Sequence, residues 1–291
     1  MSKDKYTNKY IRFSESEKIF CCPICKSDLH FKEKSLICEQ NHCFDISRFG
    51  YINFNFGSKT SKKYTPESFA NRKEILESGY YSHILNELIY IINDIQNLKV
   101  VLDAGCGEGF YARNIAEKIN PKTKSELKSE ILAFDISKSA IQLAAKSDYN
   151  NCVKWFVGNM TPITLKNASV DCVLNIFSPA NYSEFLRVLS DDGYIIKVVP
   201  AKNHLKELRD IAKEHLSAQD YSNEEVIEHF QNHFKIIKRK EISATYKVSD
   251  KERDNFVNMT PLLFHVEKES LNLRAIENIT IQAEIIVGKK L

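Results

Sequence analysis

The stretch "VLDAGCGEGF", residues 101–110, decides the fold of this chain. It holds three glycines at alternate positions, although the 291-residue chain contains only nine glycines. Glycine destabilises the interior of a helix or strand, so the cluster indicates a tight turn whose backbone passes close to a ligand. Apolar residues before the turn predict a buried strand, and "YARNIAEKI" after it predicts a helix.

The order of the glycines distinguishes this turn from two other nucleotide-binding loops. A phosphate-binding P-loop has the pattern G-x-x-x-x-G-K-[ST], and a dinucleotide site has G-x-G-x-x-G. Here G-x-G-x-G follows an aspartate, which resembles motif I of the S-adenosylmethionine-dependent methyltransferases. The resemblance implies that adenosylmethionine binds at Asp103, Gly105, Cys106, Gly107, Glu108 and Gly109. The Glu108 side chain has two interpretations, because it can face the positive charge of that ligand or water.

Strands and helices alternate after the turn. "EILAFD", "VKWFV", "VDCVLNI" and "YIIKVVP" are apolar runs of strand length. Their alternation with helical segments predicts an α/β fold with a parallel sheet that helices cover on both faces. Two C-terminal strands, "FKIIKRKEISATYKV" and "ITIQAEIIVGKKL", would complete the Rossmann-like, seven-stranded sheet of the class I methyltransferases that the glycine motif resembles.

Polar side chains follow several of these strands at their carboxyl ends, where open α/β sheets bind ligands. Asp135 is predicted to accept the ribose hydroxyls, with the alternative that it caps the next helix for about 1 kcal/mol. The resemblance places Asn159 against the adenine amine, and capping of a turn is an equal alternative. The segment "NIFSPA" is predicted to orient the methyl acceptor through Asn175, Ser178 and Pro179.

A second motif lies near the N-terminus, in "FCCPICKSDLHFKEKSLICEQNHCFD", residues 20–45. Cys22 and Cys25 form a C-x2-C pair, and Cys38 and His42 form a C-x3-H pair after twelve intervening residues. Two such pairs supply the four ligands of a tetrahedral zinc ion, and a closed set of four indicates a structural site. Cys43 is an alternative to His42 as the fourth ligand. Buried free thiols are the alternative for the whole cluster.

Composition and charge limit the class of protein. The 43% hydrophobic and 27% charged residues are ordinary for a globular protein. No apolar run reaches the length of a membrane span and the N-terminus lacks the apolar core of a signal peptide, so we expect a cytoplasmic protein without membrane contact. Residues 1–63 carry 12 basic against 7 acidic side chains, which suits an anionic partner as well as a solvated surface.

Together, the two motifs resemble those of the 23S ribosomal RNA guanine-N1 methyltransferases. The matching stretches are "CPICKSDL", "ICEQNHCFDISRFGYINF", "VLDAGCGEGFY", "FDISKSAIQLAAK", "NIFSPA", "HLKEL" and "NMTPLL". The resemblance implies methyl transfer from S-adenosylmethionine to N1 of a guanine in a hairpin of 23S rRNA, one structural zinc ion and often a homodimer. The alternatives are methylation of another RNA, a small molecule or a protein, and an RNA-binding protein without activity.

Three parts are therefore expected along the chain. Residues 1–56 form a small N-terminal zinc-binding β domain that recognises RNA, residues 57–96 a linker and connecting helices, and residues 97–291 the methyltransferase domain. The basic linker is expected to be disordered or to contact phosphates through Lys59, Lys62 and Lys63.

The segments around these motifs give three further expectations. Ser78-Gly79 is predicted to separate two helices. "NFVNMTPLLFH" is expected to line a substrate pocket or to pack a helix on the sheet. Four histidines show no metal-ligand spacing and are expected at the surface or at helix caps: His204, His215, His229 and His233.

Overall fold

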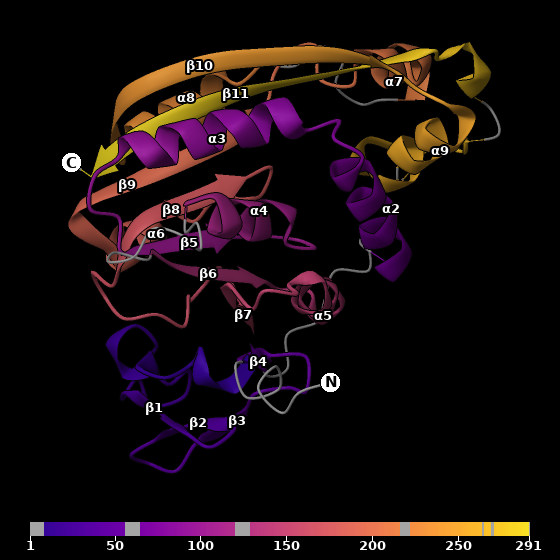
Figure 1. Cartoon of the computed structure of the whole chain (residues 1–291). Helices are drawn as coiled ribbons and strands as arrows, with labels where there is room; N and C mark the ends of the chain where they lie inside the picture. Colours follow the sequence, from indigo (N-terminus) through magenta and orange to yellow (C-terminus); the bar gives the residue numbers. More distant parts are fainter. Residues whose placement is uncertain are drawn as a thin grey trace.

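The computed structural model describes residues 9–55, 65–119, 129–215, 222–263, 265–268 and 271–290. Lys59, Lys62 and Lys63, the lysines expected to contact phosphates, lie outside these residues. The described strands form a three-stranded antiparallel sheet and a large eight-stranded sheet (Figure 1). The small sheet consists of β1 (Leu29–Lys32), β2 (Ser35–Cys38) and β3 (Cys43–Asp45).

The large sheet has the strand order β10-β11-β9-β8-β5-β6-β7-β4. Its strands are β4 (Tyr51–Asn53), β5 (Val100–Ala104), β6 (Glu130–Asp135), β7 (Val153–Val157), β8 (Val170–Ile176), β9 (Leu189–Pro200), β10 (Phe234–Lys247) and β11 (Asn278–Lys290). Strands β4 to β9 pair in parallel, and β11 pairs antiparallel with both β9 and β10. The predicted α/β class and its seven strands are confirmed. Strand β4 lies in "FDISRFGYINFNFG", which the sequence predicts as a strand pair, but its pairing with the large sheet was not predicted.

Helices connect the parallel strands and cover both faces of the sheet. They are α2 (Pro66–Glu77), α3 (Ser82–Asp94), α4 (Phe110–Ile119), α5 (Lys138–Ser147), α6 (Tyr182–Val188), α7 (Lys206–Ile211), α8 (Glu224–Gln231) and α9 (Asp250–Met259). Short 3-10 turns lie at Ser16–Lys18, Lys213–His215, Pro261–Leu263 and Leu273–Ala275. The predicted break at Ser78-Gly79 is confirmed, because α2 ends at Glu77 and Gly79 has a φ of 90°.

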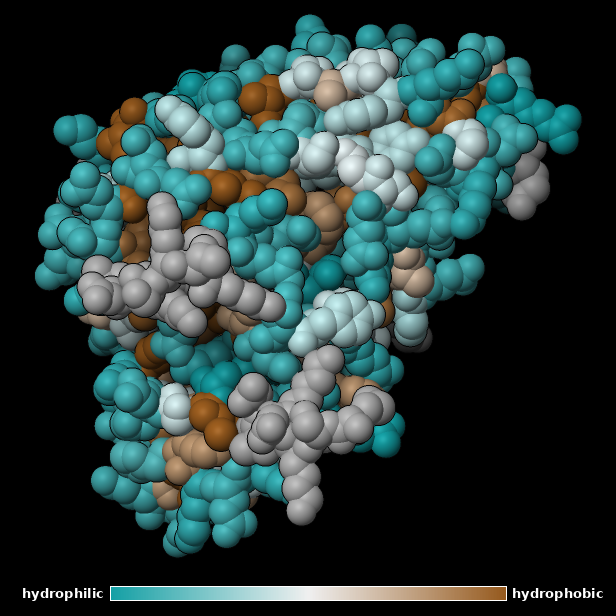
Figure 2. Space-filling view, viewed as in Figure 1, coloured by the Kyte–Doolittle hydropathy of each residue, from teal (hydrophilic) through white to brown (hydrophobic). Residues whose placement is uncertain are grey.

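Two hydrophobic cores lie on opposite faces of the sheet. One contains the apolar sides of α3, α4 and α9, with Trp155 of β7 fully buried. The other contains apolar residues of α6 and α8 together with those of the N-terminal module, which we define as residues 9–50. No helix within the described ranges is long and apolar enough to cross a membrane. The face seen in Figure 2 is largely hydrophilic, with smaller hydrophobic patches.

The N-terminal module continues directly into the large sheet through β4. Tyr51 and Asn53 pair in parallel with Trp155 and Val157, so that β7 is not an edge strand. Phe20 of the module packs edge-on against Phe156 of β7, with ring centroids 5.3 Å apart. The module therefore shares both backbone hydrogen bonds and apolar packing with the large sheet.

A buried ion pair strengthens this junction. Arg12 donates from Nη1 to Asp148 Oδ2 at 3.0 Å and also to the carbonyls of Val153 and Gly50. The Trp155 Nε1–H donates to the same Asp148 oxygen at 3.0 Å. A Cβ on Gly50 would lie 2.3 Å from the Arg12 guanidinium, so only glycine fits there. The bonds to three acceptors offset the desolvation of the buried guanidinium.

Replacement of Arg12 tests this junction. Arg12→Met leaves the Asp148 carboxylate buried without its cation, so we expect the free energy of unfolding to fall by about 3 kcal/mol or more. Lys18→Met is the matched control, because Lys18 pairs with Glu15 at the surface and such pairs contribute roughly 0–1 kcal/mol. Urea unfolding of both variants measures the difference. Equal, small losses would show that the junction does not depend on Arg12.

Candidate functional site

The glycine turn lies between β5 and α4 and is held by close packing. Gly105, Gly107 and Gly109 have φ values of 80°, 57° and 81°. A Cβ on Gly109 would lie 2.5 Å from the Trp155 ring, and a Cβ on Gly105 would lie 2.8 Å from Ser178 Cβ. Gly109 and Gly105 thus let the turn pack closely against other parts of the fold, namely β7 and the turn after β8. Gly107 has no such contact, since its nearest neighbour is Arg72 Nη1 at 3.7 Å.

Asp135, at the end of β6, holds the glycine turn in place. Its carboxylate accepts the N–H of Gly107 at 3.0 Å and the N–H of Ser137 at 2.8 Å. The alternative that Asp135 caps the next helix is wrong, because Ser137 is the N-cap of α5 and its hydroxyl accepts the N–H of Ala140. Burial raises the pKa of Asp135. The carboxylate keeps acceptor capacity for further hydroxyls, since it has about four lone-pair sites.

Asp103 lies underneath the turn. Its side chain is 1% exposed, and its Oδ2 has no hydrogen-bond partner among the described residues. Burial, followed by the charges of Glu108 and Asp135, raises the pKa of Asp103 to about 8. The structure therefore places Asp103 behind the turn as a buried acid.

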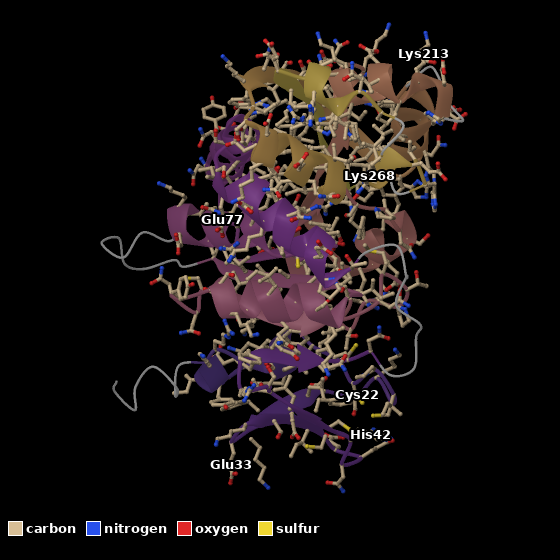
Figure 3. All side chains as sticks on the ribbon, turned by 90° about the vertical axis from the view of Figure 1, so that its right-hand side faces the viewer. Cys22, Glu33, His42, Glu77, Lys213 and Lys268 are labelled. Atoms are coloured by element: carbon tan, nitrogen blue, oxygen red, sulfur yellow. The ribbon has the colours of Figure 1, made fainter. Side chains whose placement is uncertain are left out.

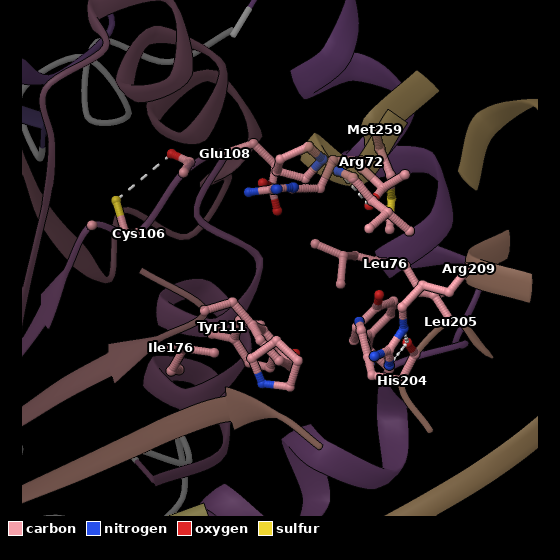
Figure 4. Close-up of a pocket in the computed structure, with 18 residues that line it drawn as sticks. Arg72, Leu76, Cys106, Glu108, Tyr111, Ile176, His204, Leu205, Arg209 and Met259 are labelled. Carbon is pink, nitrogen blue, oxygen red and sulfur yellow. Dashed lines mark hydrogen bonds between the residues drawn. The ribbon is translucent and has the colours of Figure 1, made fainter. Parts of the chain in front are cut away.

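A cavity of about 300 Å³ opens on the other side of the glycine turn (Figure 4). Of the residues predicted to bind adenosylmethionine, Gly105, Cys106, Gly107 and Glu108 line it. Ile176 and Phe177, from the predicted "NIFSPA" segment, also line it. Residues that the sequence did not indicate complete its wall: Arg72, Leu76, Tyr81, Tyr111, Pro200, His204, Leu205 and Arg209. Met259–Leu262 also line it, which confirms the expectation that "NFVNMTPLLFH" contributes to a pocket.

Charged side chains gather at the end of the cavity that the glycine turn forms. Burial raises the pKa of Glu108, which is 2% exposed, and the positive charge of Arg72 opposes this rise. Arg72 reaches this position from α2, over the backbone of Gly107. The end of the cavity therefore presents one cation and one carboxylate, an arrangement suited to the zwitterionic end of an amino acid.

Asn175, at the end of β8, is fully buried and uses its amide inside the protein. Its Nδ2 donates to Ser178 Oγ at 2.6 Å and to the Pro179 carbonyl at 2.9 Å. Its Oδ1 accepts from Lys197 Nζ at 2.6 Å, and burial lowers the pKa of Lys197 to about 8. Ser178 Oγ donates to the Ala104 carbonyl at 2.8 Å. Asn175 therefore holds the turn after β8 from behind, without facing the cavity.

Three other predicted residues, Ser178, Pro179 and Asn159, lie away from the 300 Å³ cavity. Ser178 and Pro179 line a neighbouring cavity of about 510 Å³, which shares Phe177 and Pro200 with the first. Asn159 is half-buried and its Oδ1 accepts the N–H of Thr161 at 3.3 Å, so it does cap a local turn. A role at the adenine stays a prediction.

The N-terminal module brings four metal-ligand side chains together. The ligand atoms of Cys22, Cys25, Cys38 and His42 all lie within 4.8 Å of one another. Cys25 Sγ and Cys38 Sγ are 3.6 Å apart, and Cys38 Sγ and His42 Nδ1 are 3.3 Å apart. Zinc–ligand bonds of about 2.0–2.3 Å at tetrahedral angles require roughly 3.5–3.8 Å between ligand atoms, so the set fits zinc.

The neighbouring cysteine is not part of this cluster. Cys43 is exposed, and its Sγ points to Asp45 Oδ1 at 3.8 Å. Cys22 and His42 lie together at the end of the molecule opposite Lys213 (Figure 3). The site has no open position beside its four ligands, as is typical of structural zinc.

Comparisons with known proteins agree with both halves of the molecule. Residues 20–55 match the family model of the RlmA N-terminal zinc ribbon, and residues 95–258 match that of a methyltransferase domain. A crystal structure of an S-adenosylmethionine-dependent methyltransferase from Aquifex aeolicus is 14% identical, covers 78% of this chain and 100% of its own, and has a TM-score of 0.46. The glycine turn and the matched domain define the class: this is a methyltransferase that uses S-adenosylmethionine, and its ribbon module holds structural zinc.

Two curated relatives cover nearly the whole chain. YxjB of Bacillus subtilis, named as a 23S rRNA (guanine-N1-)-methyltransferase, is 30% identical over 281 residues, 94% of this chain and 97% of the relative. The 23S rRNA (guanine(748)-N1)-methyltransferase of Streptomyces fradiae is 26% identical over 259 residues, 88% of this chain and 89% of the relative. The chain belongs to the 23S rRNA (guanine-N1-)-methyltransferase family.

Substitution of single cysteines tests the metal site. Cys25→Ser removes one of four ligands, so we expect much less than one zinc ion per chain and an N-terminal module that unfolds at lower denaturant concentration. Cys43→Ser is the matched control and is expected to keep one zinc ion per chain. Elemental analysis of the purified variants measures the metal content. A Cys43→Ser protein that loses zinc while Cys25→Ser retains it would contradict this ligand set.

Proposed function

We propose that this enzyme transfers the methyl group of S-adenosylmethionine to N1 of a guanine in a hairpin of 23S rRNA, in the cytoplasm. The observation that carries the proposal is the cavity: its charged end at the glycine turn suits an amino acid, and aromatic rings line its wall. The substrates named for the two relatives support the choice of acceptor.

The charged end of the cavity suits the cofactor. Bound adenosylmethionine supplies an electrophilic methyl group on a sulfonium. We assign its carboxylate to the Arg72 guanidinium and its ammonium to the Glu108 carboxylate, because both side chains meet over the glycine turn. Asp135 keeps acceptor capacity for the ribose hydroxyls, beside the turn whose Gly107 N–H it already holds.

The aromatic part of the cavity suits a nucleobase. Tyr81, Tyr111 and Phe177 line it, and base–aromatic stacking contributes about 1–3 kcal/mol per base. Guanine N1 lies in the Watson–Crick face, so the target base must be unpaired or flipped out before it can enter. Alignment of the methyl acceptor with the sulfonium accounts for much of the rate of such a displacement.

The Asn175 network positions the turn that carries Phe177. Phe177 has a φ of 50°, which is a strained conformation for a residue with a side chain. The bonds from Asn175 to Ser178 and Pro179 hold the chain on the far side of this residue. Asn175, Ser178 and Pro179 thus orient the base indirectly, through the ring of Phe177.

The zinc module contributes to RNA recognition. Pairing of β4 with β7 and the buried Arg12–Asp148 pair fix its placement relative to the cavity. The excess of basic over acidic side chains in the first 63 residues suits binding to the phosphates of a hairpin. The module would hold the RNA while one base of the hairpin enters the cavity beside the glycine turn.

Two further expectations belong to this proposal. A homodimer is expected, and light scattering on the purified protein measures it. Methylation of another RNA or of a small molecule is the alternative activity, and methyl incorporation into 23S rRNA compared with these acceptors distinguishes the two.

A product assay tests the reaction. Wild-type enzyme with adenosylmethionine and a 23S rRNA transcript should yield 1-methylguanosine, detected by mass spectrometry of the digested RNA. Asn175→Ala should lower kcat by about 100-fold, as a displaced reacting group does, while the Kd for adenosylmethionine changes less than threefold. Asn278→Ala, an exposed position at the start of β11, is the control. Equal losses in kcat and in cofactor affinity would place Asn175 in the cofactor site.

The assignment of Arg72 gives a separate test. Arg72→Gln removes the cation at the charged end of the cavity, so the Kd for adenosylmethionine should rise at least tenfold, the loss of one charge-assisted hydrogen bond. Arg274→Gln, which changes the same charge at an exposed 3-10 turn, should leave this Kd unchanged. Isothermal titration calorimetry measures both values. An unchanged Kd for Arg72→Gln would assign the carboxylate to another group.

A further inference from the structure

His204 lies in the cavity wall, so the expectation that it would be a surface or capping residue is wrong. Its ring stacks on Phe177, with centroids 5.6 Å apart and planes at 29°, and meets Tyr81 edge-on at 6.1 Å. Phe177, which stacks on this ring, and Leu205, the residue after His204 in the chain, both have φ values near 50°. Strained backbone of this kind persists where the surroundings impose it, and it gathers at functional sites.

The hydrogen bonds of His204 determine its tautomer. The backbone N–H of Gln282, in β11, donates to His204 Nδ1 at 3.3 Å, so Nδ1 carries no proton. Burial, followed by the charge of Arg209, lowers the pKa of His204 to about 4, so the ring is neutral at neutral pH. A neutral imidazole whose Nδ1 is unprotonated carries its proton on Nε2.

The Nε2–H group is available to a ligand. Nε2 has no hydrogen-bond partner among the described residues, and it is not one of the buried polar atoms that are sealed from solvent. Arg209 fixes the segment that carries the ring, because its guanidinium donates to the carbonyls of Lys202 and His204. The cavity therefore contains a rigid hydrogen-bond donor that stays neutral at neutral and alkaline pH.

Such a donor suits the O6 atom of guanine when N1 is methylated. When N1 loses its proton, the negative charge spreads to O6. A hydrogen bond to O6 stabilises this anion, in the way that a fixed donor stabilises a developing oxyanion, so N1 loses its proton more easily and a larger fraction of the base is the nucleophilic anion. Adenine carries an amino group at the same place, and two donors would face each other there.

We propose that His204 Nε2–H donates to O6 of the target guanine, which activates N1 for methylation and selects guanine over adenine. In the reaction the N1–H bond breaks and its electron pair forms the N1–CH3 bond. The S–CH3 pair stays on sulfur, and the proton goes to water at the cavity mouth. This inference rests on the proposed function.

The pH dependence of kcat tests the role of His204. His204→Phe keeps a stacked ring and removes the donor, so kcat on a 23S rRNA hairpin should fall by about 100-fold at pH 7. The loss should shrink towards pH 9.5, because solvent then deprotonates N1 without help. His204→Gln restores an N–H donor and should be faster than His204→Phe. His215→Ala, at an exposed position, is the control with wild-type kcat.

The outcomes separate this inference from the function on which it rests. Wild-type enzyme that forms no 1-methylguanosine would contradict the proposed function. Wild-type enzyme that forms it, with a His204→Phe variant of unchanged kcat or of equal loss at every pH, would overturn the role of His204. A Kd for adenosylmethionine that rises as much as kcat falls would overturn it too, by placing His204 in the cofactor site.

Discussion

Between β5 and α4 the backbone of Gly109 lies against the Trp155 ring, and a Cβ there would come within 2.5 Å of it. This contact fixes where the glycine turn leaves the sheet. Asp135 then holds Gly107 from β6, and Ser178 packs on Gly105 from the turn after β8. Three neighbouring strands thus meet at one turn, and the cavity opens on its free side. A larger residue at Gly109 would displace the turn and with it the wall of the cavity.

The buried polar groups behind the cavity form a second layer. Asn175 links Lys197 of β9 to the turn after β8, and Ser178 links that turn to the Ala104 carbonyl of β5. None of these bonds faces the ligand. They belong to the fold and lie next to Phe177, whose ring stacks on His204. Rigid elements hold a site more accurately than loops do.

Local patterns in the sequence predicted most of the fold and one half of the site. Alternating strands and helices, the glycine turn and the paired cysteines each depend on residues close together in the chain. The sequence favoured His42 over Cys43 because Cys43 begins a strand, and the structure brings His42 and not Cys43 into the cluster. The pairing of β4 with the large sheet was missed because its partner, β7, lies about 100 positions away in the chain. His204 was misplaced because the cavity joins α2, the 204–209 segment and residues 259–262, which only the folded chain brings together.

The pairing of β4 with β7 also has a consequence for solubility. In the large sheet β4 covers the backbone hydrogen-bonding groups of β7, and its three residues follow the zinc-binding module directly. If the module unfolds, β4 no longer pairs with β7 and the edge of β7 is exposed. An exposed strand edge is a template for pairing with other chains. Loss of zinc is therefore expected to favour self-association of the enzyme, because it would expose the edge of β7.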